Sequence, residues 1–513
     1  MKALEAPGQG SRLLSRSGGT PVGGRACGPI WHWIFSLALG SLAALSAAAH
    51  AAVPNPTITG PIAATAIPGD PSHDYPFFAS DKDLATNGYI EEEFRIQGSA
   101  NRYTTPSLAT GTVIDSGHPY LTRLIVRRPV DPRRFNGAVL VEWLNVTNGF
   151  DADNLWFFDW EHVLREGYAW VGVSAQNVGV ARLLSWNPTR YAGLDVTQGG
   201  AITGDDLSYD IFSQVGQAIR HPLGVDPLGG LKPLVIIGTG ESQSASRLST
   251  YVNSINPLAN VYDGFLLLST LGNLIRTDLT VPVWKVLTEL DVFGSEAAVR
   301  QPDTTMFRTW EVAGSSHVDE HLRKSREPLE LRDFSTSTVA SSSEAILAPQ
   351  CQVPTIGTRV PTGYVVGSAF DLLVRWVKHR TQPPSAPRIA VSSVGPPAVI
   401  ERDSNGLALG GIRLSQLAVP TAVNVGVNSG PGACQRWGYY IPFPISQLDS
   451  LYPTHDSYVA QVVKVTLDNL QNNTSRHPMR SRRCSMPLTP LSATRIEAGI
   501  TAAIWLNSGS KGK

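Results

Sequence analysis

The feature that most constrains this chain is a regular alternation of apolar runs and amphipathic segments between residues 137 and 317. The runs at 137–145, 168–176 and 261–269 are almost wholly apolar, which is typical of strands buried on both faces. Segments with helical spacing, at 156–167 and 209–221, lie between them. Strands that alternate with helices predict an α/β fold, with a mostly parallel sheet and helices on both faces.

The rest of the chain is divided by changes in composition. Residues 1–51 predict a signal peptide, because arginines precede an apolar stretch and small residues at 49–51 suit a signal peptidase. We expect 52–88 to form an extended lead-in, 89–334 the α/β core, and 335–513 a C-terminal extension or cap that completes the domain. The mature protein is therefore expected to be exported, periplasmic or secreted, without a stable membrane anchor after cleavage.

Charge and cysteine content narrow the class of partner and the compartment. Lys+Arg and Asp+Glu both number 42, so the formal net charge is zero, which argues against a nucleic-acid partner. Cys351, Cys434 and Cys484 follow the predicted signal peptide, and an oxidising compartment favours one disulfide. We predict a Cys351–Cys434 bond and a free Cys484, because Cys484 lies in the basic stretch 476–484.

The strongest chemical signal is the pentad Gly240-Glu241-Ser242-Gln243-Ser244, which stands between an apolar strand (233–237) and a predicted helix (244–256). A serine nucleophile on such a strand-to-helix turn has small residues two positions to either side, usually as G-x-S-x-G. Here Ser244 replaces the second glycine and remains small. The pattern predicts that Ser242 is a nucleophile, whereas the simpler interpretation makes it only a helix N-cap.

A serine nucleophile needs a base and an acid, which should follow it in the order acid, then histidine. The predicted strand at 281–291 ends with Glu289 and Asp291, and the one at 305–317 ends with His317 after a flexible "AGSS" approach. We predict the triad Ser242, Asp291 and His317, with Glu289 as the alternative acid. For the oxyanion hole we expect the backbone N–H of Gln243 and a donor near Asn145 and Val146.

These residues resemble a known family, the alpha/beta hydrolase domain family, whose members are largely uncharacterised and often exported bacterial proteins. The resemblance covers nearly the whole mature chain, and it is carried by residues 120–149, 167–180, 209–220, 240–257, 261–267, 313–319, 401–414 and 451–459. It implies an α/β-hydrolase fold and hydrolase activity, but it brings no substrate.

Together these signals predict a serine hydrolase of carboxylic esters that takes a small-molecule acyl substrate and requires no cofactor or metal. Two alternatives stay open. Residues 317–321, "HVDEH", match the H-x-x-E-H zinc pattern, with His317 and His321 one helical turn apart and Glu320 as base. The chain could also be an exported binding protein on an inactive hydrolase fold. The aromatic segments 155–160 and 436–444 are candidates for an acyl pocket, although ordinary core is the simpler interpretation.

Overall fold

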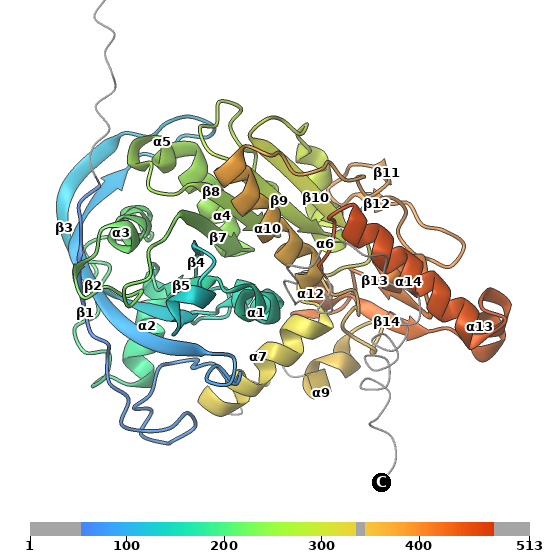
Figure 1. Cartoon of the computed structure of the whole chain (residues 1–513), viewed down its shortest axis with the longest axis horizontal. Helices are drawn as coiled ribbons and strands as arrows, with labels where there is room; N and C mark the ends of the chain where they lie inside the picture. The colour runs from blue at the N-terminus through green and yellow to red at the C-terminus, as the bar shows by residue number, and fades with distance from the viewer. Residues whose placement is uncertain (1–52, 335–343, 477–513) are drawn as a thin grey trace, which may run out of the picture. The chain divides into compact units, whose positions relative to one another are not determined.

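A computed structural model describes residues 53–334 and 344–476 (Figure 1). The predicted signal peptide, Cys484 and most of the polar stretch at the start of the C-terminal extension lie outside the described residues. Predictions that rest on them stay predictions.

The centre of the fold is a ten-stranded sheet whose order is β10-β9-β8-β7-β4-β5-β3-β2-β1-β6. Strands β5, β4, β7, β8, β9 and β10 run parallel to one another, whereas β3 is antiparallel to both β2 and β5. The mostly parallel sheet predicted from the apolar runs is confirmed. The strands are β1 (Thr57–Thr59), β2 (Tyr89–Tyr103), β3 (Val113–Pro129), β4 (Ala138–Trp143), β5 (Ala169–Val173), β6 (Leu223–Gly224), β7 (Val235–Glu241), β8 (Gly264–Leu268), β9 (Val283–Thr288) and β10 (Phe307–Val312).

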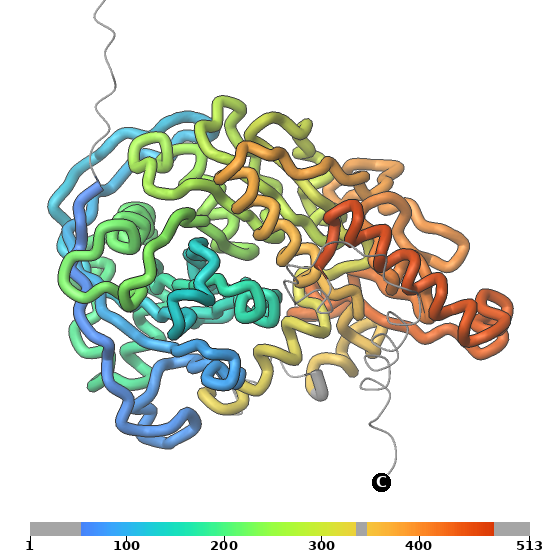
Figure 2. Tube along the Cα trace, in the orientation of Figure 1, coloured from blue at the N-terminus to red at the C-terminus, as the bar shows by residue number. Residues whose placement is uncertain are grey.

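The sheet is wound in two directions from its middle. After β4 the chain forms β5 on one side, and later it returns to form β7, β8, β9 and β10 in succession on the other side. Figures 1 and 2 show the long β2–β3 pair, in blue at the left, curving beyond β5 on the first side of the sheet. In open α/β sheets, ligands bind at the carboxyl ends of the strands where the winding reverses. The loops that follow β4 and β7 are therefore the expected place for a site.

Helices cover both faces of the sheet, as predicted. On β7, Ile237 and Gly238 point to opposite faces because side chains alternate along a strand. A Cβ on Gly238 would lie 3.5 Å from Phe212, so α3 covers one face of β7. The Ile237 side chain points to the other face, where it and Val377 of α10 both lie beside Gly264 of the neighbouring strand. The helices before the C-terminal part are α1 (Asn154–Glu166), α2 (Asn177–Trp186), α3 (Ser208–Arg220), α4 (Gln243–Thr250), the π-helical turn Tyr251–Ile255, α5 (Asn256–Ala259), α6 (Glu289–Gly294) and α7 (Glu320–Asp333).

The C-terminal part supplies one helix that packs on the central sheet and a separate group of smaller elements. Helix α10 packs against β7, β8 and β9 and against α1, so it belongs to the helical layer of the core. The elements are α9 (Glu344–Leu347), α10 (Gly363–His379), β11 (Val391–Ser393), β12 (Val399–Ile400), α11 (Ser415–Ala418), β13 (Ala422–Val425), α12 (Cys434–Trp437), β14 (Tyr439–Pro442), α13 (Ile445–Leu451) and α14 (His455–Gln471). In Figure 1 β13, β14, α13 and α14 lie together, in orange to red. The predicted Cys351–Cys434 disulfide is present, which confirms that pairing.

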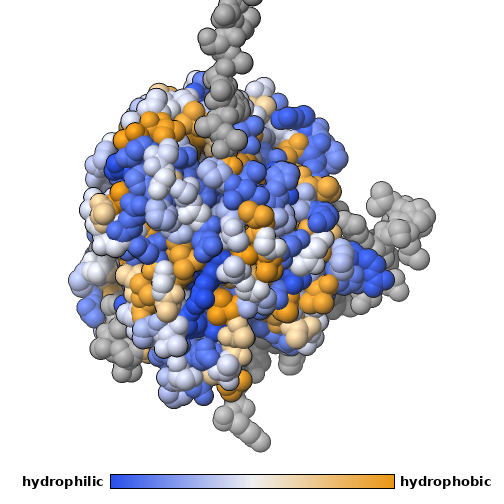
Figure 3. All heavy atoms as spheres, turned by 90° about the vertical axis from the view of Figure 1, so that its left-hand side faces the viewer, coloured by the Kyte–Doolittle hydropathy of each residue, from blue (hydrophilic) through white to orange (hydrophobic). Residues whose placement is uncertain are grey.

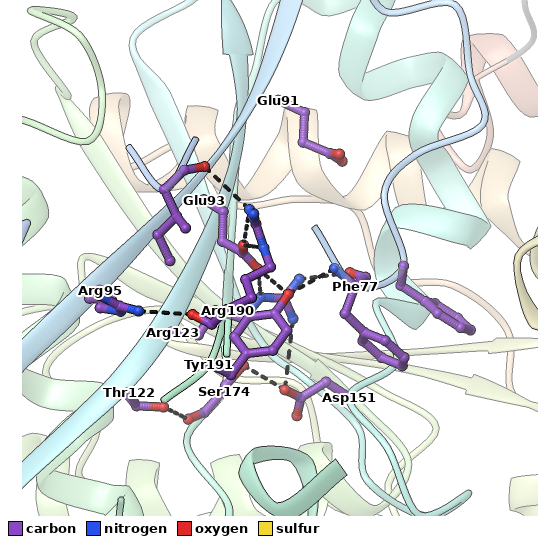
Figure 4. A network of polar contacts seen from close by, with 12 residues as sticks. Phe77, Glu91, Glu93, Arg95, Thr122, Arg123, Asp151, Ser174, Arg190 and Tyr191 are labelled. Carbon is purple, nitrogen blue, oxygen red and sulfur yellow. Dashed lines mark hydrogen bonds and ion pairs between the residues drawn. The ribbon is translucent and has the colours of Figure 1, made fainter. Parts of the chain in front are cut away.

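A buried network of charged groups fixes the lead-in and the loop between β4 and α1 to the sheet (Figure 4). Glu93 on β2 accepts hydrogen bonds from Arg123 on β3, from Arg190 at 2.6 Å and from Tyr191 at 2.8 Å. Arg123 also donates to the carbonyl of Phe77 in the lead-in at 2.7 Å. Its other guanidinium nitrogen lies 3.9 Å from Asp151, which belongs to the loop between β4 and α1. The network thus holds this loop, which follows the central strand, in one place.

The surface of the described residues has two further properties. On the face turned to the viewer in Figure 3, hydrophilic and hydrophobic side chains are interspersed rather than gathered into one patch. A search of the described residues for a helix with the length and apolar character of a membrane span found none.

Candidate active site

Ser242 lies on the turn between β7 and α4, at the carboxyl end of the strand where the winding reverses. Its backbone has φ 60° and ψ −120°, a conformation that is rare for a residue with a side chain. The Ser242 N–H donates to the carbonyl of Leu268 on β8 at 2.9 Å, which anchors the turn to the neighbouring strand. The residue as a whole is 8% exposed, so it lies at the edge of the interior.

The small residues on either side of the turn touch each other. A Cβ on Gly240 would lie 3.1 Å from the carbonyl carbon of Ser244, which is closer than ordinary van der Waals contact. The Ser244 hydroxyl accepts from the N–H of Glu241 at 3.1 Å and donates to the Glu241 carbonyl at 2.9 Å. Ser244 therefore fits the space of the usual glycine and adds hydrogen bonds that fasten the helix to the strand.

His317 lies between Ser242 and Asp291. Its Nε2 atom is 2.7 Å from the Ser242 Oγ, and its Nδ1 atom is 3.0 Å from the Asp291 Oδ1. The approach to His317 is not flexible as expected: Ser315 and Ser316 are fully buried, and their hydroxyls donate to the carbonyls of Val312 and Val318. Buried hydrogen bonds hold this loop, so the ring is fixed in place.

The two candidate acids face different partners. The predicted strand at 281–291 ends early, at Thr288, and Asp291 lies in the first turn of α6. The Asp291 Oδ2 atom accepts from the Thr288 N–H and hydroxyl, both at 2.7 Å, which leaves Oδ1 toward His317. Glu289 instead pairs with Arg402 at 2.6 Å and accepts from the Gly314 N–H at 2.8 Å. The structure thus brings Asp291, and not Glu289, to the histidine.

A further carboxylate reaches the same histidine. Glu241, the residue before Ser242, places Oε1 3.1 Å from the His317 Nε2 atom. Its Oε2 atom accepts from the side-chain amides of Asn145 at 3.2 Å and Asn154 at 2.8 Å. Nε2 is therefore within hydrogen-bond distance of both the Ser242 hydroxyl and a buried carboxyl group.

Burial and charge shift the pKa values of this pair. Burial lowers the pKa of His317, but the negative charges of Glu241 and Asp291 outweigh it, so the pKa lies above its ordinary value of 6.5. Burial raises the pKa of Glu241, and the effect exceeds the opposing influence of His317 and Asn154. The negative charge of Glu241, 3.1 Å from Nε2, therefore stabilises the protonated form of His317.

Some of the N–H groups predicted as oxyanion donors already donate hydrogen bonds within the protein, whereas others do not. Gln243 is the first residue of α4, a position whose N–H has no acceptor within the helix. The Asn145 N–H donates to the Ala152 carbonyl, and its side-chain amide donates to the Glu241 carbonyl and carboxyl group, so Asn145 is not available as predicted. Within residues 53–334 and 344–476, no hydrogen bond engages the N–H of Val146. Gln243 and Val146 remain the candidate donors.

The zinc pattern at 317–321 is not arranged as that hypothesis requires. Helix α7 begins at Glu320 with Asp319 as its N-cap, so His317 and His321 do not lie one turn apart on a helix. Glu320 pairs with Lys324 at 3.0 Å and with Arg359 at 3.3 Å. Both ring nitrogens of His317 are engaged by Ser242, Glu241 and Asp291.

A pocket of about 330 Å³ opens beside Ser242 and His317. Its walls include Phe150, Leu322, Phe334 and Trp437 among the apolar residues and Glu241, Arg326, Glu330 and Arg436 among the charged ones. Of the aromatic segments proposed for an acyl pocket, 436–444 contributes Arg436 and Trp437, whereas Tyr440 stacks on Arg359. Trp156 of the other segment is buried against Trp170 and Arg127, which makes it part of the core.

Comparison with known proteins now adds the family. The profile described as "Alpha/beta hydrolase domain" matches residues 58–474. The chain belongs to this family. Family membership supports hydrolase activity and, with the sheet topology, the α/β-hydrolase fold that the resemblance implied.

Several solved structures are similar to this alpha/beta hydrolase at a large evolutionary distance. A putative dienelactone hydrolase from Klebsiella pneumoniae is 13% identical over 50% of this chain and 97% of its own, with a TM-score of 0.23. A serine hydrolase without a lid from Xanthomonas campestris is 12% identical over 46% and 93%, with a TM-score of 0.28. The esterase LipA from Xanthomonas oryzae is 12% identical over 37% and 47%, with a TM-score of 0.22. No curated protein matches the chain. Likenesses at this level assign no activity or substrate.

The residues predicted from the sequence did not include Glu241, and they included Arg436 only as the first residue of the aromatic segment 436–444. A signal for Glu241 was available, because a carboxylate at the end of an apolar strand and next to the candidate nucleophile must be buried. No local pattern marks Arg436 as a charged group of the pocket, because it reaches the pocket from an element far along the chain.

Proposed function

We propose that this alpha/beta hydrolase is a serine hydrolase that acts on carboxylic esters through an acyl-enzyme. The observation that carries the proposal is the chain of contacts from Ser242 Oγ through the His317 ring to Asp291, at 2.7 Å and 3.0 Å. The strained backbone at Ser242 supports it, because such strain is common at functional residues.

In the proposed reaction, the neutral His317 ring takes the hydroxyl proton as Ser242 attacks the ester carbonyl. Asp291 holds the Nδ1–H and stabilises the imidazolium. The N–H groups of Gln243 and Val146 receive the negative oxygen of the tetrahedral intermediate. His317 then gives its proton to the departing alkoxide and activates the water that cleaves the acyl-enzyme.

Covalent labelling tests the nucleophile directly. A fluorophosphonate probe should modify the wild type and fail to modify Ser242→Ala. Ser242→Ala and His317→Ala should each remove nearly all ester turnover, because members of a triad act as a unit. Labelling that persists in Ser242→Ala would reject the assignment.

The acid and the zinc alternative are tested by matched variants. Asp291→Asn should reduce kcat by about 10⁴-fold, as the loss of the orienting carboxylate does in serine proteases. Glu320→Gln and treatment with a chelator should leave turnover near the wild-type value. Activity that a chelator removes and zinc restores would favour the metal mechanism.

We also propose that the protein is exported after cleavage near Ala51. The Cys351–Cys434 disulfide supports this, because disulfides persist in oxidising compartments. N-terminal sequencing of the mature protein from the periplasm or the medium tests the proposal. A mature chain that retains residues 1–51 inside the cell would contradict it.

A further inference from the structure

The pocket beside the triad contains two arginines, and they differ in their acidic partners among the described residues. Arg326 on α7 is neutralised by Glu330, whose Oε1 atom lies 3.0 Å from the Arg326 Nε, and both side chains are buried. Arg436 on α12 also lines the pocket, but among the described residues no carboxylate forms an ion pair with its guanidinium. Among the described residues that line the pocket, Arg436 is thus a cation without an ion-pair partner.

The backbone of Arg436 is fixed relative to the triad. Its carbonyl accepts from the N–H of Val318, the residue after His317, at 2.8 Å. Two residues earlier, Cys434 forms the disulfide with Cys351, and the next residue, Trp437, is 2% exposed. The anchored backbone fixes the point from which this half-buried guanidinium extends along the pocket wall, which lowers the entropy that a bound ligand would cost.

The electrostatics place the Arg436 charge near the reacting atoms. Burial lowers the pKa of Arg436, and the positive charge of Arg326 lowers it further, whereas Glu241 acts in the opposite direction. The charge of Arg436 in turn lowers the pKa of His317. A partly buried charge without a partner is costly, and an anion that enters the pocket removes that cost.

We propose that Arg436 binds a carboxylate on the acyl part of the substrate, so that this enzyme prefers half-esters of short dicarboxylic acids. The inference rests on the proposed function of Ser242. A guanidinium presents paired N–H donors that match a carboxylate. The Arg436 guanidinium balances a single negative charge, while the Glu241 carboxylate on the same wall disfavours a dianion such as a phosphate group.

The size of the pocket fits this class of substrate. A volume of about 330 Å³ lies at the lower end of small-molecule sites, which span roughly 300–1,000 Å³. Phe150, Leu322 and Phe334 offer an apolar surface for a few methylene groups between the ester carbonyl and the carboxylate. A short dicarboxylic half-ester has this combination of an apolar middle and one charged end.

The test compares two esters of nearly equal shape, the 4-nitrophenyl half-ester of glutaric acid and 4-nitrophenyl pentanoate. We expect the wild type to prefer the half-ester. Arg436→Gln should lower kcat/KM for the half-ester by about ten- to a hundredfold, the usual range for a lost hydrogen bond to a charged group. The loss on pentanoate should be much smaller, so the ratio of the two values falls, and Arg436→Lys should restore part of it.

A matched control and a second readout separate binding from a structural effect. Arg359→Gln changes an arginine whose side chain is 50% exposed and does not line the pocket, and it should leave both esters unaffected. Free glutarate should inhibit the wild type competitively and should inhibit Arg436→Gln at least tenfold more weakly.

Other outcomes overturn the inference. Equal losses on both esters in Arg436→Gln, or unchanged inhibition by glutarate, would show that Arg436 does not bind the carboxylate. A preference for a phosphate-bearing ester over the half-ester would also reject it. If pentanoate is hydrolysed and Ser242 is labelled without any dependence on Arg436, only this inference fails. If neither ester is hydrolysed and Ser242 is not labelled, the proposed function fails instead.

Discussion

Gly240→Ala should destabilise the turn between β7 and α4 and lower the turnover number, and the reason is steric. The added Cβ would lie 3.1 Å from the carbonyl carbon and Oγ of Ser244 and 3.2 Å from its carbonyl oxygen, where ordinary contact begins at 3.4 Å. Ser244 cannot withdraw, because it is fully buried and bonded to Glu241 through its hydroxyl. The strand and the helix must therefore separate by about 0.3 Å or more.

The size of the effect follows from that displacement. Overpacking of this kind lowers the free energy of unfolding by about 1–3 kcal/mol. A misplacement of 1 Å in an active site costs roughly 10²-fold, so a few tenths of an ångström at Ser242 should cost about four- to tenfold in kcat. Steady-state hydrolysis of an activated ester and unfolding in guanidinium chloride measure the two quantities.

Gly294→Ala is the matched control, because a Cβ on Gly294 meets nothing within 4 Å. This variant should keep its kcat, and its stability should be unchanged or slightly higher because alanine reduces the entropy of the unfolded chain. Equal behaviour of Gly240→Ala and Gly294→Ala would refute the steric explanation of the pentad.

Further variants probe charge and cross-links. Glu241→Gln removes the negative charge that raises the pKa of His317, so the ring stays neutral to lower pH. The acidic limb of the kcat/KM profile should therefore move to lower pH. An unmoved limb would contradict the assignment of His317 as the catalytic base. Replacing Cys351 and Cys434 by alanine opens a loop of 83 residues and should cost up to about 4.5 kcal/mol of unfolding free energy by the chain-entropy relation; a loss below about 1 kcal/mol would argue against that role. Glu93→Gln leaves buried arginines without their carboxylate and should lower the unfolding free energy by about 3–5 kcal/mol, measured by denaturant titration; an unchanged midpoint would contradict a structural role for the network.

Much of the fold could be predicted from the sequence, because it rests on local patterns. Strands β4, β7 and β8 are buried along their whole length, and this is recorded directly in their apolar composition. Gly167 ends α1 in the left-handed conformation at φ 78°, as the position of a glycine after a helical run predicts. The end of β9 was harder to predict, because Thr288 begins a helix through its cap and not through a change in hydrophobicity.

Residues of the candidate site could be predicted only where their order along the chain and their positions after strands identify them. The order of serine, acid and histidine and their positions after successive strands led to Ser242, Asp291 and His317. Asn145 was assigned wrongly as an oxyanion donor, because its amide is engaged by Glu241 and Ala152, and no sequence pattern records that contact.

The sequence by itself therefore determined the α/β alternation, the strand-to-helix turn at Ser242 and the need for a small residue at position 244. Each of these follows from backbone geometry within a few residues. Tertiary structure alone decided which carboxylate serves His317. Glu289 and Asp291 stand two residues apart, and the long-range contacts of Glu289 with Arg402 and Gly314 turn it away while Asp291 faces the ring. It also brought Glu241 and Arg436 to one pocket, because contacts between segments distant along the chain depend on packing, which no local pattern encodes.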